Sequence, residues 1–146
     1  MKKLNNAINF VAEVGCNHQG NLKLAFKMID TLVNFCDIKF VKFQKRNPIE
    51  LLGEERYNMP HPVPANSFGK TYGLHREKLE FTIKQHKKIL SYCKKKKIEY
   101  MCSAWDLTSL KELILNQQSK YLFLLCLCFY QEIFLLITRY RIMKIG

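Results

Sequence analysis

The sequence predicts an α/β fold in which parallel strands alternate with helices. Strand-like apolar segments recur at 8–14, 38–43 and 98–102, and each is followed, directly or after a long connection, by a stretch of helical periodicity. Polar residues come directly after each strand. This β-α-β-α-β-α order implies parallel strands joined by right-handed helical crossovers. The chain has 146 residues, which is enough for one domain with a core of its own.

The first predicted unit begins with segment 8–14, which is rich in β-forming residues and ends at Gly15. Asn21 can cap the helix that follows, because an asparagine side chain accepts hydrogen bonds from the free amides of a first helical turn. The apolar residues of this helix recur at three- and four-residue spacing, which places them on one face: Ala25, Met28, Ile29, Leu32 and Cys36.

The second predicted strand covers 38–43 and the third covers 98–102. Thr82 followed by Gln85 is a capping-box pattern, which opens a helix before the third strand. Asp106 can cap another helix after that strand. Each of these helices has one apolar face, formed by His86, Ile89, Leu90 and Cys93 in the first and by Leu107, Leu110, Leu113 and Ile114 in the second.

A long connection, 45–81, separates the second strand from its helix. It contains all four prolines of the chain, three of them within the run 60–64. Connections of this length are uncommon in compact domains and are usually functional or disordered. We therefore expect a functional or a disordered loop here.

The C-terminal segment 116–146 differs in character from the rest. Residues 121–137 form an almost continuous apolar run without turn signals, interrupted by Gln131 and Glu132. A buried hydrophobic helix and a transmembrane span are two interpretations, although a charge within a span is costly. We favour a third, a translated frameshift, because the sequence changes character so abruptly. We therefore expect a β/α part over 1–115 and a divergent tail over 116–146.

The composition is that of a basic globular protein. The formal net charge is +12, and 48% of the residues are hydrophobic. The basic residues are spread along the chain apart from the run 94–97, and no zinc finger, RNP motif or basic heptad accompanies them, so we predict no nucleic-acid partner. The polar amino terminus does not resemble a signal peptide, so we expect a cytoplasmic protein whose six cysteines are free thiols.

Polar side chains stand at the carboxyl end of each predicted strand, where parallel β/α folds form their active sites. A carboxylate, an amide, an amine and a hydroxyl would converge there. Lys42, Lys45 and Arg46 would make this mouth cationic and suited to a phosphate or carboxylate ligand. The candidates are Glu13 with Asn17 and His18, Lys42 with Gln44 and Lys45, and Ser103 with Asp106.

Several of these residues have structural alternatives. Glu13 could form an ion pair with a lysine on a neighbouring strand instead of acting in catalysis. Asp106 is better explained as a helix cap than as a catalyst. Cys16 and His18 need not face each other, so we do not expect a thiolate–imidazole nucleophile. His86, on an apolar helix face, is expected in the core or at its rim.

Three strand-end motifs carry a family resemblance. Residues 12–20 read A-E-V-G-C-N-H-Q-G, residues 41–44 read V-K-F-Q and residues 102–106 read C-S-A-W-D. At these positions the sequence resembles the sialic acid synthase family, whose patterns are A-E-I-G-x-N-H-x-G, V-K-F-Q and S-T-P-F-D. The first two motifs match almost residue for residue, and the third is looser. The resemblance covers residues 8–115.

The resemblance implies a partial (β/α)8 TIM barrel, of which this chain holds the first three β/α units. It implies an N-acetylneuraminate or nonulosonate synthase, a transferase that condenses phosphoenolpyruvate with an N-acylated hexosamine in sialic-acid-type carbohydrate biosynthesis. By position, Glu13 and Lys42 would be catalytic, Lys42 would contact phosphoenolpyruvate, and Ser103 would bind its phosphate. Glu13, Gln44 and Asn66 would address the sugar. The resemblance also implies homodimers and a divalent metal, Mn²⁺ or Mg²⁺, with ligands outside these motifs.

The departures from the family pattern concern the segment after residue 115. The family continues with a K-I-x-S strand and later supplies two metal-binding histidines, whereas 120–124 stands at the place of that strand and no histidine follows His86. Three β/α units cannot close an eight-stranded barrel, so we expect this chain to be inactive and poorly stable by itself.

Two other functions stay open on the sequence alone. One is a Schiff-base aldolase on the same barrel, with Lys42 as the nucleophile. The other is a small basic membrane-associated protein that uses 121–137 and the flanking residues Arg139, Arg141 and Lys144.

Overall fold

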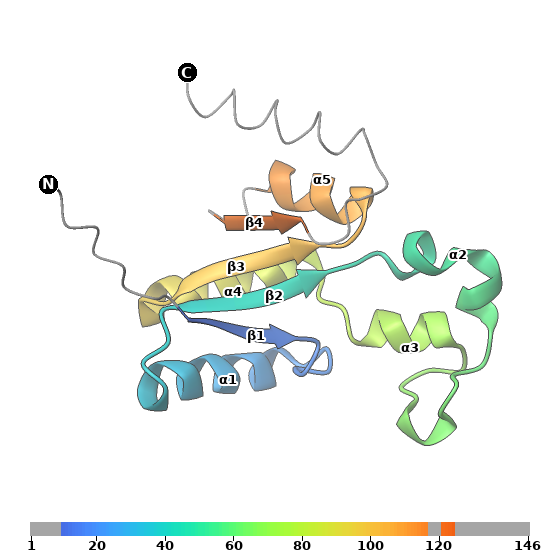
Figure 1. The fold of residues 1–146 in the computed structure, drawn as a ribbon, viewed down its shortest axis with the longest axis horizontal. Helices are drawn as coiled ribbons and strands as arrows, with labels where there is room; N and C mark the ends of the chain where they lie inside the picture. The colour runs from blue at the N-terminus through green and yellow to red at the C-terminus, as the bar shows by residue number, and fades with distance from the viewer. Residues whose placement is uncertain (1–9, 117–120, 125–146) are drawn as a thin grey trace, which may run out of the picture.

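The structure is a computed structural model that describes residues 10–116 and 121–124. Within these ranges, four parallel strands form one sheet in the order β1-β2-β3-β4 (Figure 1). The strands are β1 (Val11–Gly15), β2 (Phe40–Lys45), β3 (Glu99–Ala104) and β4 (Tyr121–Leu124). The predicted parallel α/β architecture is confirmed, and β4 adds a fourth strand beyond the three that we expected. The frameshift, buried-helix and membrane interpretations concern the tail 116–146, of which the structure describes only 116 and 121–124.

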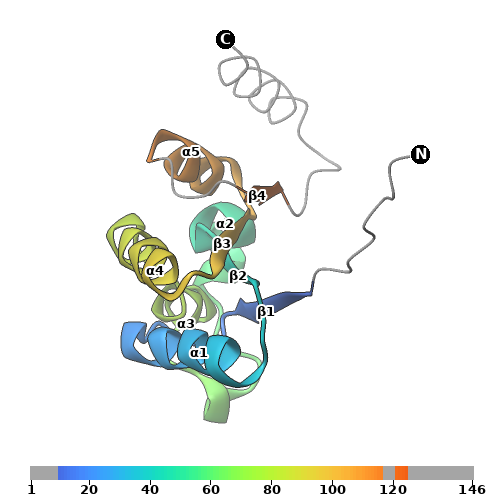
Figure 2. The same ribbon diagram turned by 90° about the vertical axis from the view of Figure 1, so that its left-hand side faces the viewer.

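Three helices lie on one face of the sheet, and in Figure 2 they stand together on one side of the strands. They are α1 (Leu22–Phe35), α4 (Ile83–Lys96) and α5 (Leu107–Leu115). Each follows a strand in the chain and returns to the end where the next strand begins (Figure 1). The opposite face of the sheet is therefore free of helices within the part of the chain that the structure describes.

The amino termini of these three helices have the predicted caps. Asn21 Oδ1 accepts hydrogen bonds from the amides of Lys23 and Leu24 at 2.9 and 3.1 Å. Thr82 and Gln85 form the complete capping box, and Asp106 Oδ1 accepts from the Ser109 amide at 2.6 Å. Because these caps satisfy amides that no helical carbonyl can reach, they fix where each helix begins.

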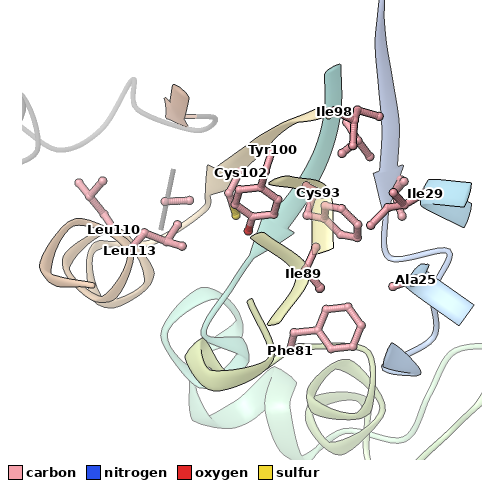
Figure 3. Close-up of a cluster of buried hydrophobic side chains, with 14 residues drawn as sticks. Ala25, Ile29, Phe81, Ile89, Cys93, Ile98, Tyr100, Cys102, Leu110 and Leu113 are labelled. Atoms are coloured by element: carbon pink, nitrogen blue, oxygen red, sulfur yellow. The ribbon is translucent and has the colours of Figure 1, made fainter. Parts of the chain in front are cut away.

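The hydrophobic core lies between the sheet and the three helices (Figure 3). Alternate strand residues point into it, as expected for the two-residue period of a strand. The strands contribute Val41, Phe43, Tyr100, Cys102 and Ala104, and the helices contribute Ala25, Ile29, Ile89, Cys93, Leu110 and Leu113. The residues between them, such as Lys42 and Gln44, consequently face the open side of the sheet.

The long connection is folded into a helical lobe beyond the carboxyl ends of the strands (Figure 1). It contains α2 (Pro48–Asn58), a short 3-10 helix, η1 (Pro64–Asn66), and α3 (Tyr72–Lys78). Gly73 lets α3 approach α2 closely, because a Cβ at this position would collide with the Tyr57 ring. The Tyr57 hydroxyl donates a hydrogen bond to Glu77 Oε1 at 2.6 Å. Of our two expectations for this connection, the disordered loop is wrong, and a functional role stays a prediction.

Among the described residues, no helix has the length and apolar character needed to cross a bilayer.

Candidate active site

Four of the five candidate residues lie on the open face of the sheet. The pairing of β1 with β2 places Glu13 opposite Lys42, and the pairing of β2 with β3 places Gln44 opposite Ser103. These two pairs form neighbouring rows, because residues two apart in a strand share a face. We call this group the open-face cluster: Glu13, Lys42, Gln44 and Ser103.

An ion pair forms the first row of the open-face cluster. Lys42 Nζ lies 2.6 Å from Glu13 Oε2, and the two side chains are 20% and 44% exposed. Glu13 Oε1 also accepts a hydrogen bond from the Gly15 amide at 3.1 Å. This local contact bends the end of β1, where Gly15 has φ +54° and the register with β2 shifts. The carboxylate is thus held by its own strand and presents its other oxygen to Lys42.

Gln44 and Ser103 form the second row. Gln44 Oε1 accepts a long hydrogen bond of 3.6 Å from the Cys16 thiol. Ser103 is 1% exposed, and its Oγ has no hydrogen-bond partner. A buried hydroxyl without a partner is uncommon because burial costs it the hydrogen bonds that water would provide. Ser103 therefore has unused hydrogen-bonding capacity on the open face.

Two further cations of the predicted mouth are neutralised. Lys45 Nζ lies 3.3 Å from Glu112 Oε2 of α5, on the helical side of the sheet. The Arg46 guanidinium binds Glu80, with Nε and the terminal nitrogen each 2.5 Å from Oε1. The expectation that Lys45 and Arg46 make the mouth cationic is therefore wrong. Lys45 turns away because it alternates with Gln44, and Arg46 is taken up by a buried carboxylate.

Sequence reasoning missed the role of Glu80. This residue stands in the loop before α4 and is 34 positions from Arg46, so no local pattern could pair them. Its Oε2 also accepts from the Arg46 backbone amide at 3.1 Å. Burial raises the pKa of the Glu80 carboxyl, and the charge of Arg46 opposes that rise. Arg46 in turn reaches the Cys16 thiol, so one guanidinium joins the ends of β1 and β2 to this loop.

Cys16 and His18 do not form a nucleophilic pair. The His18 ring stacks on Phe81 with centroids 3.9 Å apart, and its Nδ1 accepts from the Gly20 amide at 3.1 Å. Burial lowers the pKa of His18 to about 4, so it is neutral at physiological pH. Burial also raises the pKa of the Cys16 thiol, which disfavours the thiolate. The described contacts therefore give no support to a thiolate–imidazole nucleophile at these two residues.

Three other candidates lie apart from the open-face cluster, whereas Asn17 lies beside Glu13 at one pocket. Asp106 is a helix cap, as predicted, and its Oδ2 also accepts from the Asn47 amide at 2.6 Å. His86 is fully buried in the core, with Nδ1 2.7 Å from the Tyr100 hydroxyl. Asn66, the fifth candidate site residue, is the last residue of η1 in the lobe. It is exposed, and its backbone amide donates a hydrogen bond to the Val63 carbonyl at 3.0 Å.

The fold and the open-face cluster define a class of protein. A parallel β/α sheet with a lysine, a carboxylate, an amide and an unsatisfied hydroxyl toward the carboxyl ends of its strands has the construction of a β/α enzyme.

Comparisons with known proteins identify the family. The model of the NeuB family matches residues 28–121, and the chain belongs to this family. N-acetylneuraminate-9-phosphate synthase of Mus musculus is 35% identical over 96 residues, which are 66% of this chain and 26% of that protein. The synthase of the same name from Drosophila melanogaster is 34% identical over 110 residues, 75% of this chain and 29% of that protein. The chain therefore spans less than a third of the length of these relatives.

A solved structure supports the same conclusion. The crystal structure of N-acetylneuraminic acid (sialic acid) synthetase from Leptospira borgpetersenii serovar Hardjo-bovis, in complex with citrate, superposes with a TM-score of 0.63 at 26% identity. The match covers 81% of this chain and 36% of that one. The resemblance to the sialic acid synthase family is thus confirmed. The family match and β4 both extend past residue 115, where we had placed the domain boundary.

Proposed function

We propose that the open-face cluster is the phosphoenolpyruvate-binding part of a nonulosonate synthase site. In the proposed reaction, carbon 3 of phosphoenolpyruvate attacks the aldehyde carbon of an open-chain N-acylated hexosamine, water adds at carbon 2, and the carbon–oxygen bond to phosphate breaks. The observation that supports this best is the unpartnered Ser103 hydroxyl on the same face as Lys42, in a member of the NeuB family. The phosphate of the substrate would supply the missing acceptor.

Each residue of the open-face cluster has a role in this proposal. The Lys42 ammonium would bind the anionic substrate, and the Ser103 hydroxyl would donate a hydrogen bond to its phosphate. Because Glu13 pairs with Lys42 in the absence of substrate, an anion that reaches Lys42 would release the Glu13 carboxylate. Glu13 could then accept a hydrogen bond from a sugar hydroxyl, together with Gln44. This exchange favours binding of phosphoenolpyruvate before the sugar.

A metal site is not formed by the described residues. They contain no group of three histidine, cysteine, aspartate or glutamate side chains that could hold an ion, and Glu13 is engaged by Lys42. The divalent metal that the resemblance implies, Mn²⁺ or Mg²⁺, remains a proposal, with ligands from outside the described residues. Asn66 remains a proposed sugar contact from the lobe, and the cytoplasmic location and homodimeric assembly remain predictions.

The ion pair also bears on the Schiff-base alternative. A Schiff base requires a lysine nitrogen that can attack a carbonyl carbon, whereas Lys42 Nζ lies in contact with the Glu13 carboxylate. We expect no covalent adduct at Lys42 when the chain is treated with pyruvate and borohydride. Mass spectrometry of the Lys42 peptide would reveal such an adduct if the aldolase alternative were right.

Titration of phosphoenolpyruvate into the purified chain, followed by calorimetry or amide NMR shifts, tests the proposal. We expect Lys42→Ala to weaken binding about 10- to 100-fold, since a hydrogen bond to a charged group contributes about 1.5–3 kcal/mol. Lys39→Ala is the matched control, because Lys39 is an exposed lysine just before the other end of β2. Glu13→Gln should tighten binding, because it removes the carboxylate that competes for Lys42.

Ser103→Ala separates a binding role from a structural one. The substitution removes a buried hydroxyl that has no partner, so the free energy of unfolding should stay the same or rise, while phosphoenolpyruvate binding weakens. Equal binding by the Lys42→Ala and Lys39→Ala variants, or a Ser103→Ala variant that binds normally, would contradict the proposed site. By itself the chain is expected to bind phosphoenolpyruvate but not to convert it to product, even with added sugar and Mn²⁺.

A further inference from the structure

The outer surface of the helical layer has a charge that the proposed site does not use. Helix α4 carries six lysines and no acidic residue. The only acidic residues of α1 and α5 are Asp30 and Glu112, and both are paired: Asp30 Oδ1 lies 2.6 Å from Lys96 Nζ, and Glu112 lies 3.3 Å from Lys45. The layer therefore presents exposed lysines without compensating carboxylates: Lys23, Lys27, Lys84, Lys87, Lys88, Lys94, Lys95 and Lys111.

Large apolar side chains are exposed at one end of this layer. Phe35 at the end of α1 is 84% exposed, Leu115 at the end of α5 is 81% exposed, and Phe10 before β1 is 70% exposed. These are the three most exposed large hydrophobic residues of the described chain. All three lie at the end of the sheet where the parallel strands begin, the end that faces the reader in Figure 2. We call this end the amino-end rim.

The lysine run reaches the same rim. Helix α4 ends there with Lys94–Lys96, followed by Lys97 in a left-handed conformation. Lys39 adds a further cation just before β2, and the exposed acids of this end are Asp37 and Glu99. Among the described residues, lysines outnumber carboxylates at the rim, and the adjoining helix α4 contains no acidic residue of its own.

A surface that combines lysines with exposed phenylalanine and leucine fits an anionic lipid bilayer. The lysines are attracted to lipid phosphates, and the apolar side chains can enter the boundary between headgroups and acyl chains. Nucleic acid fits less well, because α1, α4 and α5 contain no arginine, the residue that most often contacts base edges.

We propose that the amino-end rim and the adjoining lysines of α4 dock this protein on an anionic membrane surface. The docking is peripheral, and it requires none of the described helices to span the bilayer. The open-face cluster lies toward the carboxyl ends of the strands, so a chain docked by the rim keeps its site mouth toward water. The proposal does not depend on the proposed synthase function.

Flotation of the full chain with lipid vesicles tests this docking. We expect binding to phosphatidylcholine vesicles in which about a third of the lipid is phosphatidylglycerol, none to pure phosphatidylcholine, and weaker binding as salt is raised. The triple variant Lys88→Gln, Lys94→Gln, Lys95→Gln should bind about 100-fold more weakly, because each lysine near such a surface contributes about fivefold in partitioning. Phe35→Ser should weaken binding about tenfold.

The matched control is Arg56→Gln, Lys70→Gln, Lys78→Gln, which removes the same charge from exposed residues of the lobe at the other end of the molecule. The loss of vesicle affinity in this control should be at least about tenfold smaller than the loss in the α4 triple variant. Basic residues also occur outside the described ranges. Docking through α4 is therefore supported only if the α4 triple variant loses more vesicle affinity than the control triple variant. Equal losses in both triples, a Phe35→Ser variant that binds normally, absence of vesicle binding, or tighter binding to duplex DNA or RNA at the same salt would each overturn the proposal.

Discussion

Removal of the Glu80 carboxylate should destabilise the protein far more than a typical surface substitution. Glu80 is 10% exposed and Arg46 is 7% exposed in their side chains, so neither is well solvated. Three contacts join them: Nε to Oε1 and the terminal nitrogen to Oε1, each at 2.5 Å, and the Arg46 amide to Oε2 at 3.1 Å. Glu80→Ala would leave a buried guanidinium beside the Cys16 thiol without its counter-charge. Breaking a buried pair in this way costs about 3–5 kcal/mol.

Urea unfolding followed by tryptophan fluorescence measures this cost. Trp105 is the only tryptophan of the chain, and its ring centroid is 5.9 Å from the Arg46 guanidinium carbon, so the signal reports on this part of the fold. The double variant Arg46→Met, Glu80→Leu should cost much less than Glu80→Ala, because it removes both charges together. Lys96→Ala is the control, since it breaks a solvent-exposed pair with Asp30 and should move the midpoint little.

Two results would refute this reasoning. If Glu80→Ala costs less than about 1 kcal/mol, water reaches the pair and screens it. If the double variant is as unstable as Glu80→Ala, the loss comes from packing in the loop and not from an uncompensated charge.

Two further predictions concern the backbone and the core. Gly20→Ala should destabilise the protein by at least about 2 kcal/mol, because φ is +68° and the new Cβ would collide with the Lys78 carbonyl. Gly53→Ala is the control, since Gly53 has φ +69° but open space around it, and it should cost about 1 kcal/mol. Thermal unfolding compares the two variants, and equal losses of stability would contradict the predicted collision. Burial lowers the pKa of His86 to about 3, below its unfolded value of 6.5. As pH falls, the unfolded chain therefore takes up a proton before the folded chain does. The contribution of His86 to the free energy of unfolding is fully present above about pH 6.5 and should be lost as pH is lowered toward 3. Urea titrations across this range should show a shallower fall for His86→Leu, and an unchanged fall would assign it to other groups.

Local patterns were sufficient for α1, α4 and α5, for β1, β2 and β3, and for the strand-end motifs. The caps at Asn21, Thr82 and Asp106 depend on residues within three positions of one another, so the sequence displays them directly. The alternation of Val41, Lys42 and Phe43 has the same local character, and it indicated which side chains face away from the core. Parallel order then required the strand ends to lie along one edge, so the four residues of the open-face cluster were expected near one another. Lys45 and Asp106 were expected beside them, but they lie elsewhere.

Contacts between distant parts of the chain were beyond sequence reasoning. The direction of Lys45 toward α5, the pairing of Arg46 with Glu80 and the packing of α2 on α3 each join segments whose separation has no periodic signature. The lysines looked dispersed in the sequence, yet the helices bring them to one outer surface whose few acids are already paired.

The sequence by itself determined the β/α alternation, the helix caps and which strand residues face away from the core, because these depend on short-range hydrogen bonds and on the fixed periods of helix and strand. Only the tertiary structure decided which charges are available. Lys45 and Arg46 are neutralised by carboxylates from other elements, Lys42 is paired with Glu13, and Ser103 is left with an unused hydroxyl. The physical reason is that electrostatic pairing depends on distance in space, and distance in space is set by packing of the whole chain.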